Sequence, residues 1–229
     1  MTVAISRRQF VHASVALAGL ATVAPLGSVL AAEETYKWVL GESTPGTVMG
    51  PFYPLLTKAA DPGTDLTMIK GATTRAKGQL LHLMGRVVDI KGKPLKGVKV
   101  AIWQPNAAGR YSHPSDGNPA PLDPNFQGYG VAVTDADGRY RFKTIKPGPY
   151  PVTQGWDRPP HIHFEVTGLK DRQVTQIWFP DEPLNAQDRL LNGLSPAAQK
   201  MLTCKIEAPT GNIEPDSKIA LFNIILTNG

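Results

Sequence analysis

Proline and glycine recur along the whole chain and limit the length of any helix or strand. The 229 residues include 21 prolines and 22 glycines. Proline removes a backbone donor and glycine weakens regular elements, so both favour short elements joined by turns. The hydrophobic fraction of 41% is still enough for a globular chain of this length to bury a core. We therefore expect a mainly β fold.

The first 32 residues have a different character from the rest of the chain. Arg7 and Arg8 precede a weakly apolar, alanine-rich run that ends near Ala31. This arrangement resembles a twin-arginine export signal. A membrane helix is the alternative, but glycine and proline interrupt the run and small residues close it. We expect residues 1–32 to be a signal peptide, the mature form to have no stable membrane span, and the protein to be periplasmic or extracellular.

Charge and cysteine content exclude some classes of protein. Without Arg7 and Arg8, 22 basic residues face 19 acidic ones, so the formal charge falls from +5 to about +3. Basic runs with interleaved aromatic residues are absent from the sequence, so no nucleic-acid partner is expected. Cys204 is the only cysteine, and the fold must form without an intramolecular disulfide.

Two regions follow the signal. Residues 33–78 show little periodicity and are expected to form an irregular N-terminal arm. Within the arm, the rigid Gly-Pro-Phe-Tyr-Pro segment at 50–54 is expected either to pack on the core or to border a pocket. Residues 79–229 carry short β-branched runs separated by turns, and we expect them to form a β-sandwich domain.

Within 79–229, the runs 81–89 and 97–103 flank a turn and predict a hairpin. The runs 131–134 and 139–142 form a second pair, joined by residues 135–138 with an Asp-Gly step. Further strands are expected at 161–167, 173–179 and 218–227. One or two short helices are expected between 184 and 203, with Ser195 and Pro196 as cap and first position.

Two histidines in the segment Arg-Pro-Pro-His-Ile-His-Phe at 158–164 are candidate metal ligands. Side chains at i and i+2 of a strand share a face, so His161 and His163 can meet one ion while Ile162 turns away. Polar alternation on a solvent-facing strand would give the same pattern. The preceding prolines and the apolar neighbours Ile162 and Phe164 argue against a plain surface strand.

Two tyrosines are candidates because of their surroundings. Tyr111 follows Asn-Ala-Ala-Gly-Arg, and Tyr150 stands in Ile-Lys-Pro-Gly-Pro-Tyr-Pro at 145–151. A half-buried ring with a hydrogen-bonded hydroxyl is the ordinary reading of a tyrosine in a β protein. Loops rich in proline and glycine, however, often carry functional side chains.

Together these segments resemble the intradiol ring-cleavage dioxygenases, with the greatest similarity to protocatechuate 3,4-dioxygenase subunits of the beta-chain type. The resemblance runs from about residue 80 to 179 and includes Pro-Leu-Asp-Pro-Asn-Phe at 121–126. It implies a non-haem Fe(III) enzyme that inserts both atoms of O2 into a catechol. The ring would open between its two hydroxylated carbons, giving a muconate-type diacid.

The resemblance also implies roles for individual residues. Tyr111, Tyr150, His161 and His163 would hold the ferric ion, with Tyr150 and His161 axial. A phenolate is a hard anionic donor, which suits a hard, highly charged cation. Tyr150 would leave the metal when catechol binds and take up one of its protons. Arg158 would stabilise negative charge on the substrate. Gln176 matches a pocket residue of the family, although a plain sheet position explains it nearly as well.

Some positions depart from the family pattern. Val152 and Trp178 replace a tryptophan and a tyrosine that are usual in protocatechuate enzymes, which leaves the ring substituent of the substrate open. Protocatechuate enzymes pair two unlike subunits, and the segment at 50–53 resembles part of the partner subunit. We therefore expect this chain to build its site alone or as a homo-oligomer.

Two alternatives stay open at this point. A His-x-His pair also binds copper or zinc, although tyrosines in place of cysteine or carboxylate disfavour both metals. The chain would alternatively be an exported β-sandwich binding module with a non-catalytic metal site.

Overall fold

The structure is a computed structural model and describes residues 41–54 and 62–228. The predicted signal peptide at 1–32, and residues 33–40 of the predicted arm, lie outside the described residues. Within the described part of the chain, no helix is both long and apolar enough to cross a membrane.

One layer of the molecule is a five-stranded sheet built around its longest strand. Its strands are β1 (Leu80–Asp89), β4 (Arg139–Ile145), β9 (Ile206–Glu207), β10 (Lys218–Leu221) and β11 (Ile224–Leu226). β1 pairs antiparallel with β4 and parallel with β10 and then β11. β9 extends the sheet beyond β10.

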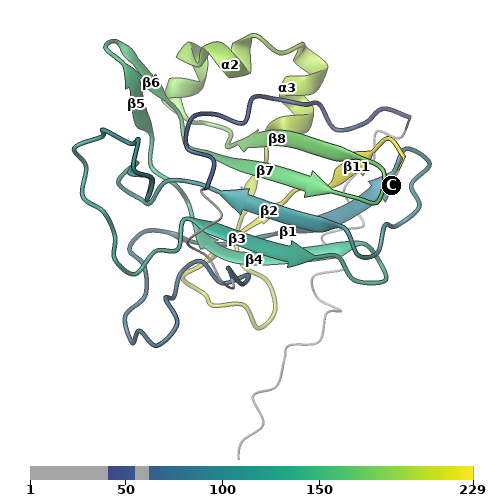
Figure 1. The fold of residues 1–229 in the computed structure, drawn as a ribbon, viewed down its shortest axis with the longest axis horizontal. Helices are drawn as coiled ribbons and strands as arrows, with labels where there is room; N and C mark the ends of the chain where they lie inside the picture. Colours follow the sequence, from purple (N-terminus) through teal and green to yellow (C-terminus); the bar gives the residue numbers. More distant parts are fainter. Residues whose placement is uncertain (1–40, 55–61, 229) are drawn as a thin grey trace, which may run out of the picture.

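The second layer is an antiparallel sheet in the order β3-β2-β7-β8. It contains β2 (Lys99–Trp103), β3 (Tyr129–Val133), β7 (His161–Thr167) and β8 (Arg172–Trp178). A separate two-stranded hairpin consists of β5 (Tyr150–Thr153) and β6 (Trp156–Arg158). Figure 1 shows this hairpin projecting at the end of the sheet where β7 begins.

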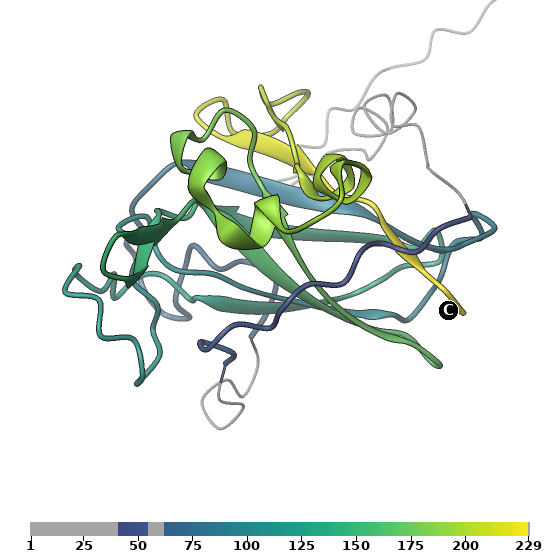
Figure 2. The same ribbon diagram turned by 90° about the horizontal axis from the view of Figure 1, so that it is seen from above.

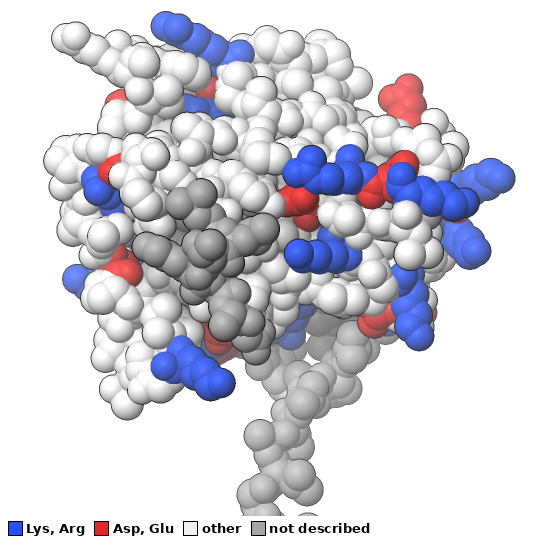
Figure 3. Space-filling view, viewed as in Figure 1, with Lys and Arg blue, Asp and Glu red and all other residues white. Residues whose placement is uncertain are grey.

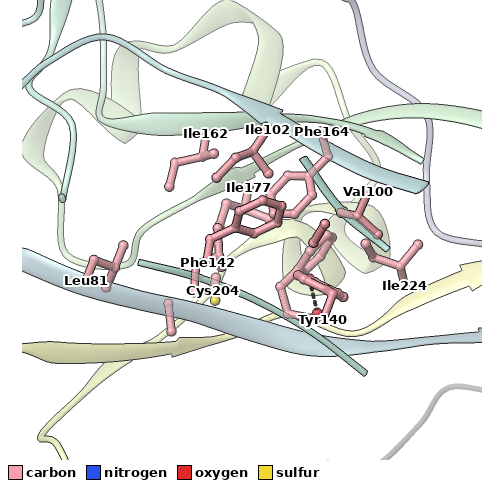
Figure 4. Close-up of a cluster of buried hydrophobic side chains, with 14 of the residues drawn as sticks. Leu81, Val100, Ile102, Tyr140, Phe142, Ile162, Phe164, Ile177, Cys204 and Ile224 are labelled. Carbon is pink, nitrogen blue, oxygen red and sulfur yellow. Dashed lines mark hydrogen bonds between the residues drawn. The ribbon is translucent and has the colours of Figure 1, made fainter. Parts of the chain in front are cut away.

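The core lies between the two sheets. Alternate residues of each strand point inward, as the period of two requires. Figure 4 shows Leu81 and Phe142 of the first sheet facing Ile102, Ile162 and Phe164 of the second. Cys204 is buried among them, and burial raises the pKa of its thiol to about 12. The predicted mainly β sandwich is therefore confirmed.

The two predicted hairpins are wrong, although the strands themselves exist. β1 and β2 flank the turn at 91–94 but belong to different sheets, and the same is true of β3 and β4 around 135–138. Each turn carries the chain across the sandwich, so that consecutive strands bury their apolar faces against each other. Gly138 adopts the positive φ of 75° expected for the Asp-Gly step.

The single strand predicted at 218–227 is also wrong in one respect, because it divides into β10 and β11. The break lies at Phe222 and Asn223, beside Gly85 of β1. A Cβ on Gly85 would lie 1.8 Å from the Phe222 carbonyl oxygen, so only glycine permits this approach.

Three short helical segments follow β8 and cover one edge of the second sheet (Figures 1 and 2). They are η2 (Pro183–Gln187), α2 (Arg189–Asn192) and α3 (Pro196–Leu202). Ser195 caps α3 by accepting from the Ala198 backbone at 3.2 Å, with Pro196 in the first turn, as predicted. Leu191 and Leu202 anchor α2 and α3 to the core.

The described parts of the predicted arm contain no helix or strand longer than a single bridge. Residues 44–48 run along β8, as Figure 1 shows in purple. The Thr47 amide donates to the Val174 carbonyl at 3.0 Å, and the Thr175 hydroxyl donates to the Pro45 carbonyl at 2.8 Å. The arm thereby covers the exposed edge of β8.

Glu214 predicts an acid-sensitive contribution to stability. Its carboxylate accepts from Lys143 at 2.6 Å and from the His82 ring at 2.7 Å. The Lys143 hydrogen bond is the main cause that lowers the Glu214 pKa to about 2. A lowered pKa stabilises the fold above the unfolded value near 4.5, and this stabilisation is lost as pH falls toward 2. Glu214 is partly exposed, so Glu214→Gln should lower the free energy of unfolding by about 1 kcal/mol or less at pH 7.

Urea unfolding of the wild type and the Glu214→Gln variant between pH 2 and 7 measures this contribution. The difference between the two chains should shrink below pH 4.5. A difference that stays constant down to pH 2 would contradict the prediction.

Candidate metal centre

His161 and His163 lie on the outer face of the second sheet, away from the core. Both are buried, with 1% and 2% of their surface exposed, while Ile162 points into the sandwich. Their ring centroids are 4.9 Å apart. The Trp103 ring stacks on His163 with 4.8 Å between centroids. The predicted shared face is therefore confirmed, and the strand is covered, not solvent-facing.

Tyr111 is presented by a loop that the Asn106 side chain organises. The Asn106 Oδ1 atom accepts from the Ala108 and Arg110 amides at 2.9 and 3.0 Å. The Tyr111 amide donates to the Asp116 carboxylate at 2.7 Å, which holds the backbone at Tyr111 in place. These local bonds hold Tyr111 over the outer face of the sheet.

The loop that leads to Tyr150 interlocks with the Tyr111 loop. The Gly148 amide donates to the Asn106 carbonyl at 3.0 Å. Gly109 has a φ of 80°, and a Cβ at this position would lie 1.9 Å from the Pro149 carbonyl oxygen. Tyr150 then begins β5 directly opposite Arg158 of β6. The sequence placed Tyr150 in a loop, whereas the structure places it at the start of this short strand.

The four predicted ligands converge on one buried place. The distances between their ring centroids are 5.3 Å for Tyr111 and Tyr150, 5.4 Å for Tyr150 and His161, 4.9 Å for His161 and His163, and 6.5 Å for Tyr111 and His163. Each side chain comes from a different loop or strand position. Such convergence of two imidazoles and two phenols defines a candidate metal centre.

Burial sets the protonation of these groups. It lowers the pKa of His161 and of His163 well below the ordinary value, assisted by the Arg158 charge, so both rings are neutral at pH 7. Burial also raises the pKa of Tyr111 well above 10, and it raises the pKa of Tyr150 despite the opposing effect of Arg158. Neutral imidazoles are ready to coordinate a cation, whereas a bound cation must displace the phenol protons.

The donor atoms fit a hard cation. His161 Nδ1 donates to the Pro159 carbonyl at 2.7 Å, which leaves the Nε2 lone pair facing the centre. The Tyr111 hydroxyl is buried without a partner in hydrogen-bonding geometry. Among the described residues, no group of three or more His, Cys, Asp and Glu side chains is placed to hold a metal. The further oxygen donors that the structure places beside these histidines are the phenol groups of Tyr111 and Tyr150.

Arg158 and Gln176 also lie at the centre, as predicted. Arg158 Nη1 donates to His161 Nε2 at 2.9 Å, and Nη2 donates to Gln176 Oε1 at 2.9 Å. Gln176 stands directly opposite His163 on β8 and is completely buried. Its amide donates to the Val48 carbonyl of the arm at 2.6 Å. Gln176 is thus a member of the centre's hydrogen-bond network and not a plain sheet position.

The segment at 50–54 borders the centre, which decides between the two roles predicted for it. The Phe52 ring lies 4.7 Å from Tyr111 and 5.9 Å from Tyr150, measured between centroids. A Cβ on Gly50 would lie 3.1 Å from the His163 ring. Tyr53 donates a hydrogen bond to Glu165 and packs edge-on against Trp103. The arm therefore forms one wall of the centre.

A groove of about 910 Å³ opens beside Tyr111, Phe52 and Trp103. Its walls continue over the outer face of β2 and β3. Lys70 and Lys99 line it, and no carboxylate side chain is among its described lining residues. The size is suitable for a small aromatic ligand. Figure 3 shows basic and acidic groups interspersed on the described part of this face of the molecule.

Asp188 and Trp103 belong to this site but were not among the predicted residues. Asp188 has the sequence signal of a helix cap, since it precedes α2, but that signal does not reveal its contact with Arg158. Trp103 ends a strand, and nothing local indicates that it stacks on a histidine far away in the sequence. Val152, which departs from the family pattern, is exposed on the β5–β6 hairpin, whereas Trp178 is completely buried beside His161.

A β-sandwich with two tyrosines and two histidines gathered outside one sheet defines a class of protein with a candidate metal site, and comparison with known proteins identifies its family. The model of a family described as "Dioxygenase" matches residues 48–228. The protocatechuate 3,4-dioxygenase beta chain of Burkholderia cepacia is 46% identical over 151 residues, which cover 64% of each chain. The hydroxyquinol 1,2-dioxygenase of Rhizobium sp. (strain MTP-10005) is 31% identical over 156 residues, covering 62% of this chain and 50% of that enzyme.

Among solved structures, the dioxygenase domain of a dioxygenase and carbohydrate-binding fusion from Streptomyces sp. SirexAA-E is similar to this chain. The TM-score is 0.60 at 27% identity, covering 81% of this chain and 99% of that domain. The matched segment spans only about half to two thirds of the length of the curated relatives above. The chain belongs to the intradiol dioxygenase family.

Proposed function

We propose that this chain is a non-haem Fe(III) intradiol dioxygenase of catechols. The observation that carries the proposal is the convergence of Tyr111, Tyr150, His161 and His163 in one buried centre. Its family membership and its relatives, which are named as dioxygenases of protocatechuate and hydroxyquinol, support the same activity. The product would be a cis,cis-muconate-type diacid that contains both atoms of O2.

The four side chains would hold the ferric ion. When bound, Fe(III) supplies a Lewis acid and a template for the two oxygens of a catecholate, and the reaction consumes no external reductant. The phenolates of Tyr111 and Tyr150 would compensate the charge of the cation and favour the ferric state. Trp103 and Phe52 pack against the candidate ligands His163 and Tyr111, which are both buried.

Tyr150 is the ligand assigned to proton transfer. Its hydroxyl is close enough to Arg158 for the guanidinium charge and a hydrogen bond to oppose the rise of its pKa. Arg158 would thus stabilise the Tyr150 phenolate, and the phenolate oxygen would accept a proton from an arriving catechol. No hydrogen bond from Arg158 contributes to the pKa of Tyr111, which would remain a ligand when Tyr150 takes up the proton.

Arg158 Nη1 would also stabilise negative charge that develops on the substrate. Gln176 would position the guanidinium from its other side. The ring substituent of the catechol would extend into the groove, where Lys70 and Lys99 favour an acidic group over a basic one.

Oxygen uptake against catechol, protocatechuate, hydroxyquinol and larger catechols tests the proposal. With ¹⁸O₂, the product should carry two labelled oxygens and lack the visible colour of the semialdehyde formed by cleavage outside the diol. A chain that is colourless and iron-free after growth in iron-rich medium, and consumes no oxygen, would instead support a non-catalytic binding module.

We further propose that residues 1–32 direct export through the twin-arginine route. The expected result is a mature, iron-loaded chain outside the cytoplasm, and its retention inside when both Arg7 and Arg8 are changed to lysine. Fractionation of cells that express the two forms measures this. Equal export of both forms would contradict the proposal.

A further inference from the structure

Asp188 is a buried carboxylate with no assigned role in the proposed reaction. It stands between η2 and α2 and has no exposed surface. Its Oδ1 atom accepts from the Leu190 amide at 3.4 Å, so it caps α2. A cap normally lies near the surface, and capping alone does not explain a fully buried charge.

The Asp188 carboxylate contacts the side chains of Arg158 and Trp178. Arg158 Nε lies 3.3 Å from Oδ1, and Arg158 Nη2 lies 3.1 Å from Oδ2. The Trp178 indole donates to Oδ2 at 2.7 Å, and the Trp178 ring lies 5.6 Å from the guanidinium carbon. This two-point contact fixes the plane of the guanidinium, as paired nitrogen and oxygen atoms do in carboxylate recognition.

The remaining edge of the guanidinium faces the metal centre. Nη1 donates to His161 Nε2, and this nitrogen is the one left free for a metal because Nδ1 is held by Pro159. When Nε2 is used as a ligand, it no longer accepts from Nη1. The N–H groups of Nη1 are then available to a substrate oxygen, while Asp188 and Gln176 hold the other edge in place.

We propose that Asp188 is a positioning residue that orients Arg158 toward the substrate and balances its charge. The inference rests on the proposed function, since it assigns Arg158 to the reacting catechol. Asp188 would act only through Arg158 and would make no contact with the metal or the substrate.

A double-mutant cycle tests this role with Asp188→Asn, Arg158→Gln and the double variant, all loaded with iron. We expect Asp188→Asn to retain iron and to lower kcat per bound iron by about 10- to 100-fold. The KM for catechol, and the anaerobic affinity for catechol followed by visible absorption, should change by less than about 3-fold. The double variant should be no slower than Arg158→Gln, because the effects of coupled residues are not additive.

Ser195→Ala is the matched control, because it removes the cap of the neighbouring helix α3 without touching the centre. It should lower the melting temperature and leave kcat unchanged. The inference would be overturned if Asp188→Asn kept the wild-type kcat per iron or lost its iron. Additive losses of kcat in the double variant would overturn it as well. If that chain does not fold, Asp188→Glu takes its place, with the same results expected. A wild type that binds iron but cleaves no catechol would overturn the proposed function itself.

Discussion

Replacing His163 by alanine is expected to remove iron and abolish ring cleavage. The side chain is buried, stacks on Trp103 and lies close to Tyr111 and His161, so its loss removes one of the two imidazoles of the centre. Loss of partners that merely support a ligand costs roughly 10- to 100-fold in activity or affinity. We expect loss of a ligand itself to exceed about 10³-fold in kcat/KM, with loss of visible absorption and of iron in metal analysis.

His113→Ala is the control for this prediction. His113 is close to the centre, with its ring 5.8 Å from Phe52, but it is not among the four proposed ligands. It also accepts a hydrogen bond from the Ser115 amide at 3.2 Å. The control should keep its iron and its colour. A His163→Ala chain that stays coloured and active would show that the ligand set is wrongly assigned.

Gly109→Ala is expected to separate the two tyrosines. A Cβ there would lie 1.9 Å from the Pro149 carbonyl oxygen, and the φ of 80° is unfavourable for alanine. Relief of this overlap requires the Tyr111 loop to move away from the segment that leads to Tyr150. We expect a loss of about 3 kcal/mol or more in the free energy of unfolding, together with loss of iron. Urea unfolding and metal analysis measure the two effects.

Gly97→Ala separates backbone strain from steric overlap. Gly97 has a similar φ of 78°, but a Cβ there would meet no atom within 4 Å. The Gly97→Ala substitution should lower the free energy of unfolding by only about 1 to 2 kcal/mol, which is the penalty of the left-handed conformation for alanine. The protein should keep its iron. If Gly109→Ala behaves like Gly97→Ala, the interlocking of the two loops does not position the ligands.

Local pattern was enough to predict most elements and to select the candidate residues of the site. A strand at 161–167 follows from its alternating residues, and the same alternation places His161 and His163 on one face. Ser195 and Pro196 predicted the start of α3, because a cap residue forms hydrogen bonds to backbone groups next to it in the sequence. The resemblance of the segments around Tyr111 and Tyr150 to a family supplied the remaining two candidate ligands. All of these signals act over a few residues along the chain.

Strand partners and the surroundings of the ligands were decided only by the tertiary structure. The turns at 91–94 and 135–138 have the composition of hairpin turns, yet each crosses from one sheet to the other because packing of apolar faces outweighs pairing of adjacent strands. Asp188 becomes the anchor of Arg158 only because η2 lies against β6, which brings residues 30 positions apart in the chain together. The sequence by itself determined which donors are available to a metal. Only the tertiary structure brings these donor side chains together, because contacts between distant segments depend on how the two sheets and the arm pack.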